Sequence, residues 1–215
     1  MQAKLLFAVL TSGITALLVG CAAATSSDDL DRQALAMIKA SFRGQGIAQL
    51  DRLDQDTGQA ACSGDTAPAE TVSARIVAEA QASIQWPAGG RYMGDWREGE
   101  KLAQSGRGMT WTDPSTASTG NGAQCYNCHQ IDKRELSFGT IGPSLWHYGK
   151  LRGVQDVADP AAAAVVQYTW GKLWNSKAYA ACSNMPRFGH AKLLNEQQLR
   201  DVMALLLDPK SPVNQ

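Results

Sequence analysis

The sequence predicts an all-α protein in which a helical extension precedes the main domain. Several segments place apolar residues three and four positions apart, the spacing of one helix face, and no stretch of useful length alternates as a strand would. No internal repeat appears, which excludes a repeat array. With 215 residues, 44% of them hydrophobic, the chain can bury one core of about 100 to 150 residues and still have sequence left over.

Residues 1–20 have the pattern of a signal peptide, with Lys4 ahead of an apolar run that is too short for a membrane span. The run ends in Leu-Val-Gly-Cys at 18–21, which resembles the lipobox of bacterial lipoproteins and makes Cys21 a candidate lipidation site. Cleavage at the small residues 22–24 is the alternative; it would discard Cys21 and release a soluble protein. Both interpretations predict export.

The region that follows, residues 21–88, is predicted to form the helical extension. Residues 28–43 and 71–84 each carry apolar side chains at helical spacing, and a polar linker separates the two segments. The proline and glycines at 87–90 end the second helix. We therefore expect the main domain to begin there and to occupy residues 89–210.

Three helices are predicted in the main domain, over residues 96–108, 160–174 and 196–208. Asp95 and Asn195 have the side chains of N-cap residues for the first and third helices. Proline occupies the first position of the second helix, where its missing N–H costs nothing. The segments between these helices carry loop signals throughout.

The five residues Cys-Tyr-Asn-Cys-His at 125–129 form the C-x-x-C-H pattern of covalent c-type haem attachment. Cys125 and Cys128 can reach the two vinyl groups on one porphyrin edge, and the His129 imidazole can then bind the iron. A redox dithiol or half a zinc site is the alternative. Redox pairs usually lie between a strand and a helix, and zinc needs two further paired ligands; this region has neither signature. The motif occurs once, so we expect one covalently bound haem c.

Met185 is the predicted sixth ligand of the iron, because it lies in a loop, on no helical stripe, and is followed by Pro186. The chain from His129 is long enough to return on the opposite haem face. A thioether ligand raises the reduction potential, and a filled sixth position favours electron transfer over oxygen or peroxide chemistry. His147 and His190 are the rival ligands, with a propionate or surface contact expected for His147. The other methionines are assigned to packing or surface positions: Met37, Met93, Met109 and Met203.

Two cysteines, Cys62 and Cys182, remain after the haem motif has used its pair. An exported protein meets an oxidising compartment, so we expect these two to be bridged. Such a disulfide would pin the extension to the Met185 loop and contribute about 2 to 5 kcal/mol. Lys plus Arg and Asp plus Glu number 20 each, so no basic surplus indicates a nucleic-acid partner.

The stretches GEKLAQSGRG, CYNCH, GPSL and NMPRFG, with the capped last helix, follow the order seen in class I cytochromes c over about residues 90–208. This resemblance implies the class I cytochrome c fold, in which the terminal helices cross. It also implies that the Pro143 carbonyl orients His129. More narrowly, GNGAQCYNCHQ, GTIGPSL and NMPRFG resemble the SoxX family, the monohaem subunits of SoxAX sulfur-oxidation complexes.

The SoxX resemblance implies a periplasmic heterodimer with a SoxA-like monohaem or dihaem cytochrome, which acts on thiosulfate and the SoxYZ carrier protein. In that family SoxA performs the sulfur chemistry as an L-cysteine S-thiosulfotransferase, and the SoxX subunit accepts electrons for a downstream acceptor cytochrome. The alternatives are a free or membrane-tethered monohaem shuttle for another respiratory complex and a haem enzyme such as a peroxidase. The extension before residue 88 and the lipobox go beyond the minimal family domain.

Overall fold

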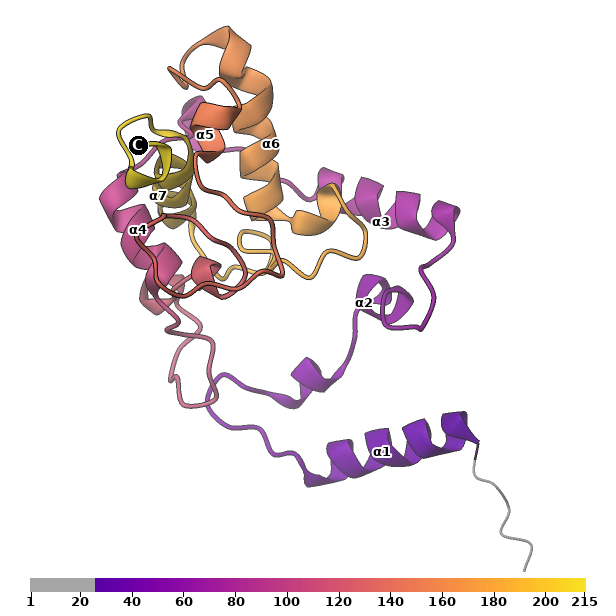
Figure 1. Ribbon diagram of the computed structural model, residues 1–215. Helices are drawn as coiled ribbons and strands as arrows, with labels where there is room; N and C mark the ends of the chain where they lie inside the picture. Colours follow the sequence, from indigo (N-terminus) through magenta and orange to yellow (C-terminus); the bar gives the residue numbers. More distant parts are fainter. Residues whose placement is uncertain (1–25) are drawn as a thin grey trace, which may run out of the picture. The chain divides into compact units, whose positions relative to one another are not determined.

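The computed structural model describes residues 26–215, and the all-α prediction is confirmed: these residues form helices and one isolated bridge, Gln45–Ala48, with no strand among them (Figure 1). The chain divides between Phe42 and Arg43 into two compact units. The expected signal peptide and Cys21 lie outside the described residues. No helix within the described part of the chain is both long and apolar enough to cross a membrane.

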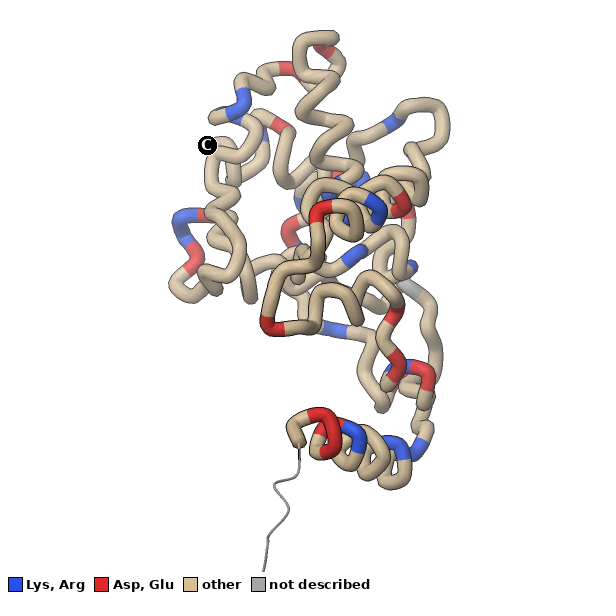
Figure 2. Tube along the Cα trace, turned by 90° about the vertical axis from the view of Figure 1, so that its right-hand side faces the viewer, with Lys and Arg blue, Asp and Glu red and all other residues tan. Residues whose placement is uncertain are grey.

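The described part of the first unit is mainly helix α1, Ser27–Ser41, which begins where the Ser26 side chain accepts a hydrogen bond from the Asp29 N–H. Acidic residues occupy its first turn and Lys39 its last, as the helix dipole favours (Figure 2). None of its residues is buried, and Met37, which we had assigned to packing, is 71% exposed. The apolar spacing predicted this helix, and its apolar side chains are exposed in the described part of the first unit.

The second unit contains six α-helices among the described residues, joined by loops and single 3-10 turns. The α-helices are α2 (Thr57–Ala61), α3 (Glu70–Ala82), α4 (Trp96–Gln104), α5 (Tyr148–Leu151), α6 (Ala163–Trp174) and α7 (Glu196–Leu207). The 3-10 turns are η1 (Leu50–Leu53), η2 (Ala88–Gly90), η3 (Ser118–Gly120), η4 (Cys125–Asn127), η5 (Pro160–Ala162), η6 (Ser176–Ala178) and η7 (Pro212–Asn214).

The predicted caps begin the predicted helices. The Asp95 side chain accepts from the Arg97 N–H at the start of α4, and Asn195 forms a reciprocal capping box with Gln198 at the start of α7. Pro160 opens η5, which leads directly into α6. Two short helices, α2 and α5, form in segments where only linker or loop signals were recognised.

Helices α4 and α7 pack directly against each other (Figure 1). The Gly94 N–H donates to the Arg200 carbonyl at 3.0 Å, and the Asp95 N–H donates to the Asp201 carboxylate at 2.9 Å. A Cβ on Gly99 would overlap the Asp201 backbone oxygen, so this close approach requires a glycine. The core includes fully buried side chains from α7 and α6, among them Leu199, Met203, Leu205, Leu207 and Trp170.

Helix α3 belongs to this same compact unit, although it lies in the predicted extension. The indole N–H groups of Trp170 and Trp174 donate to the backbone carbonyls of Gln85 and Ser83, both at 2.9 Å. These bonds fix the end of the α3 segment on α6. The compact units divide after Phe42, whereas the local helix-breaking signal at residues 87–90 predicts the boundary between extension and main domain.

Candidate cofactor site

The second unit encloses a cavity of about 630 Å³, lined mainly by apolar atoms. Cys125, Cys128, His129 and Met185 all line it, so the fold brings Met185 to the C-x-x-C-H motif, far from it in sequence, as the predicted shared site requires. The remaining walls come from the loop after α4, the loop before α5, and helices α6 and α7. This volume lies in the usual range for a small-molecule or cofactor pocket.

The C-x-x-C-H motif forms the tight turn η4, which places both thiols and the imidazole on one cavity wall. Gln124 precedes the turn in a left-handed conformation, and the His129 N–H closes it on the Cys125 carbonyl at 2.9 Å. Both cysteines of the motif are free thiols. Burial raises the pKa of the Cys125 thiol to about 12, whereas a redox dithiol needs a lowered thiol pKa. This electrostatic environment does not favour the redox interpretation of the motif.

The His129 ring is oriented by Pro143, as the family resemblance implied. Its Nδ1 lies 2.7 Å from the Pro143 carbonyl oxygen, which can only accept, so Nδ1 carries the proton in this bond. The Nε2 lone pair is then the one available to a metal. Gly142 makes room for the ring, because a Cβ there would overlap the imidazole.

Three backbone hydrogen bonds hold the Pro143 loop against the motif. The N–H groups of Gly139, Gly142 and Leu145 donate to backbone carbonyls within residues 126–130, at 2.8, 2.8 and 2.7 Å. The loop and the motif thus behave as one local structure. This arrangement fixes the Pro143 carbonyl relative to His129 without a strand or a long helix.

Met185 reaches the cavity from the loop between η6 and α7. The hydroxyl of the buried Ser176 donates to the Met185 carbonyl at 2.6 Å, and the Met185 N–H donates to the Ser183 hydroxyl at 3.3 Å. Its side chain is half-buried against the core. Both the backbone N–H and the backbone carbonyl of Met185 are therefore hydrogen-bonded to serine hydroxyl groups.

The two rival histidines do not line the cavity. The His147 Nε2 lies 2.7 Å from the Gln215 backbone oxygen, and His190 is exposed on the protein surface. Met109 does line the cavity, in a left-handed conformation, although the sequence pattern assigned it to simple packing after the helix. It is thus a second thioether beside the site.

Three cationic side chains, Arg107, Arg152 and Lys172, also line the cavity, and no aspartate or glutamate does so in the described part of the chain. Burial lowers the pKa of Lys172. The guanidinium of Arg152 lies 3.8 Å from the ring centre of Tyr148. Sequence analysis did not single out these residues; the one available signal was that Tyr168 and Lys172 lie four apart and therefore share one face of the predicted helix.

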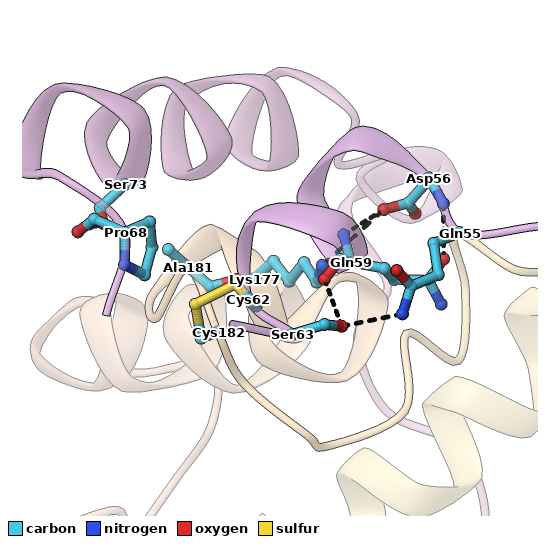
Figure 3. Close-up of a disulfide and its surroundings, with 10 residues drawn as sticks. All are labelled: Gln55, Asp56, Gln59, Cys62, Ser63, Pro68, Ser73, Lys177, Ala181 and Cys182. Carbon is cyan, nitrogen blue, oxygen red and sulfur yellow. Dashed lines mark hydrogen bonds and ion pairs between the residues drawn. A yellow bond between two sulfur atoms is a disulfide. The ribbon is translucent and has the colours of Figure 1, made fainter. Parts of the chain in front are cut away.

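Cys62 and Cys182, the pair expected to bridge, form a disulfide that joins positions 120 residues apart, with their Cα atoms 5.4 Å from each other (Figure 3). The bond ties the end of α2 to the loop that carries Met185. Cys182 precedes Met185 by only three residues, so this crosslink belongs to the immediate support of the cavity.

An all-α domain with a cysteine- and histidine-lined cavity is the class of protein that this fold and site define. No protein-family model matches the sequence. The chain is 36% identical over 164 residues to a protein of Aquifex aeolicus (strain VF5) named uncharacterized lipoprotein, across 74% of this chain and 73% of the relative. The chain belongs to the same protein family as that lipoprotein.

Proposed function

We propose that this protein is a monohaem c-type cytochrome that transfers electrons. The single observation that carries the proposal is the convergence of Cys125, Cys128, His129 and Met185 on one apolar cavity. The residues present fit a haem: two thiols lie beside an imidazole whose Nε2 is free for a metal. The cationic lining, which includes no carboxylate from the described residues, suits the two anionic propionates of a porphyrin.

Each residue has a defined role in this proposal. Cys125 and Cys128 attach the porphyrin covalently, and Pro143 holds the His129 ring in the orientation that presents Nε2. When bound, haem supplies one-electron transfer at its iron. Met185 would be the second protein ligand of the iron; it would keep small molecules from binding there and favour the ferrous state, which would raise the reduction potential.

The narrower proposal is a SoxX-like role, which rests on the sequence resemblance alone. Joining thiosulfate to a carrier cysteine through a new sulfur–sulfur bond releases one proton and two electrons. In this proposal a SoxA-like partner performs that step on the SoxYZ carrier. The chain described here accepts the electrons one at a time and passes them to a downstream cytochrome.

The proposed location is the periplasm, with a lipid anchor on Cys21. The pattern at residues 18–21 resembles a lipobox, and the relative from Aquifex aeolicus is named a lipoprotein. Lipid attachment would retain the cytochrome at a membrane surface. Mass spectrometry of the mature N-terminus distinguishes an acylated Cys21 from cleavage after the alanines at 22–24.

Covalent haem is tested by producing the full chain in cells that mature c-type cytochromes. We expect haem to remain with the polypeptide after denaturation, and Cys125→Ala with Cys128→Ala to abolish this retention, because no thioether bond can form.

Met185→Ala should abolish the far-red absorption band of a methionine sulfur–iron bond, while Met109→Leu, the control, should keep it. Loss of the band in the Met109 variant only would assign the sixth position to Met109.

The SoxX-like role is tested by mixing the ferric protein with a SoxA-like partner, the SoxYZ carrier and thiosulfate. We expect haem reduction that requires all three additions, because the sulfur chemistry belongs to the partner. Isolation as a lone monomer that does not respond to this mixture would instead favour a general electron shuttle.

A further inference from the structure

Three contacts attach the ends of helix α2 to the loop that carries Met185 and to η6, which leads into that loop. The first is the disulfide between Cys62 and Cys182. The second is the ion pair between Asp56 and Arg187, with 2.9 Å between oxygen and nitrogen, and the third is the longer pair of Asp56 with Lys177 at 4.0 Å. Figure 3 shows the disulfide and the Asp56 carboxylate at opposite ends of this short helix.

These attachment points lie on both sides of Met185 in the sequence. Lys177 and Cys182 precede it, and Arg187 follows it by two residues. Lys177 is only 8% exposed, and a buried cation needs an anion nearby, which Asp56 supplies. The loop cannot move away from the cavity without breaking these contacts or carrying α2 with it.

Asp56 is itself fixed. Its carboxylate accepts from the Gln59 N–H at 2.6 Å, and the Gln59 side chain accepts from the Asp56 N–H at 2.8 Å, which completes a capping box. Burial acts to raise the pKa of Asp56, but the bonds from Gln59 and Arg187 and the charges of Arg187 and Lys177 outweigh it and lower the pKa. The carboxylate is therefore ionised at neutral pH.

The neighbouring helix supports the same loop from behind. The Gln81 side chain of α3 donates to the Ala178 carbonyl in η6 at 3.0 Å, and Ser176 of η6 donates to Met185 itself. No residue before position 106 lines the cavity in the described part of the chain. The segment that contains α2 and α3 thus contacts the loop that supplies the proposed ligand but does not line the cavity itself.

We propose that Asp56 and the Cys62–Cys182 disulfide are positioning groups that keep the Met185 thioether on the haem iron. This inference rests on the proposed function and deepens it. Movement of the loop away from the cavity would take the methionine off the iron, and tethers on both sides of Met185 reduce the population of that open state. An added ligand that competes for the sixth position binds in proportion to this population.

The test uses the full chain with haem attached, and imidazole as the competing ligand of the ferric protein. Asp56→Asn removes both ion pairs but keeps an N-cap side chain, because asparagine caps helices as well as aspartate does. The double variant Cys62→Ser, Cys182→Ser removes the covalent tether. Asp65→Asn is the matched control, since it makes the same charge change at an exposed position of the same segment.

Imidazole that displaces the methionine removes the far-red band. We expect the imidazole concentration that removes half of the band to be about fivefold lower in Asp56→Asn than in the unmodified chain, and lower by a larger factor in the cysteine variant. The control should match the unmodified chain. Arg187→Gln removes only the shorter of the two ion pairs, so it should change the imidazole concentration in the same direction as Asp56→Asn by an equal or smaller factor, and it should add nothing when combined with Asp56→Asn. Arg187→Gln also tests the role of the ion pair if Asp56→Asn fails to fold.

The two proposals fail differently. A far-red band absent from the unmodified protein would overturn Met185 ligation, whatever the variants do. A normal band together with unchanged imidazole affinity in Asp56→Asn, Arg187→Gln and the cysteine variant would overturn the positioning role alone.

Discussion

Asp132 follows the proposed iron ligand by three residues and is almost completely buried, with 4% of its surface exposed. Its carboxylate accepts from the Arg134 backbone N–H at 2.9 Å and from the Arg134 Nε at 2.8 Å. Burial acts to raise the pKa of Asp132, but these hydrogen bonds and the charges of Arg134 and Lys133 outweigh it and lower the pKa. The ionised form is thus stabilised by folding.

The pH dependence of stability follows from this lowered pKa. A carboxyl group whose pKa is lower in the folded than in the unfolded chain stabilises the fold above its unfolded pKa of 3.8, and this is lost as the pH falls through the folded value. We expect Asp132→Asn to lower the free energy of unfolding at neutral pH and to flatten its fall below about pH 4. Urea unfolding across this range measures both effects, and equal acid slopes in the two proteins would contradict the assignment.

At the scale of elements, the contact between α4 and α7 depends on the missing side chain of Gly99. Alanine favours a helix over glycine by about 1 kcal/mol, so propensity alone predicts that Gly99→Ala stabilises. A Cβ at this position overlaps the Asp201 backbone oxygen, and forced overpacking costs about 1 to 3 kcal/mol. We expect net destabilisation by chemical denaturation, with Glu98→Ala on the exposed face of α4 as the control of small effect. A stabilised Gly99→Ala protein would show that the helices can separate without cost.

The sequence predicted the helices whose first turn contains a capping side chain or a proline. Asp95, Pro160 and Asn195 mark helix starts through side chains that act within one turn, and the structure begins helices at each. Helices α2 and α5 are too short for an apolar period to be recognised, even though α2 has a capping box. Their existence depends on tertiary contacts, such as the disulfide that holds the end of α2.

At the scale of the whole molecule, the division after Phe42 predicts which truncations are tolerated. A chain that begins at Arg43 should keep the unfolding midpoint of the longer protein, because none of the residues of α1 is buried. A chain that begins at Gly90 loses Cys62 and the whole of α3, and we expect at least about 2 kcal/mol less stability from the missing disulfide alone. Thermal unfolding of the two truncated proteins measures the difference. Equal unfolding midpoints would show that the domain folds without residues 43–89, as a boundary between extension and main domain near residue 88 predicts.

The candidate site was only partly accessible to sequence reasoning. Cys125, Cys128 and His129 carry their chemistry in a fixed local spacing, and Met185 was chosen because it belonged to no helix stripe. Cavity residues such as Lys172 and Arg152 have no such signature, since a cation on a helix is usually solvated and only the fold shows which cations face inward. The placement of Met109 also depends on how the loop after α4 folds back.

The disulfide also closes a large covalent ring in the polypeptide. Because it joins positions 120 residues apart, residues 62–182 form a closed ring that contains Cys125, Cys128 and His129. A protease that cuts once within the long loop between α4 and η4 would open the ring without separating the two halves of the chain. The segment before the cut, which contains α2, α3 and α4, would stay linked through Cys62 and Cys182 to the segment with the C-x-x-C-H motif and Met185, so a nicked protein would remain a single covalent particle.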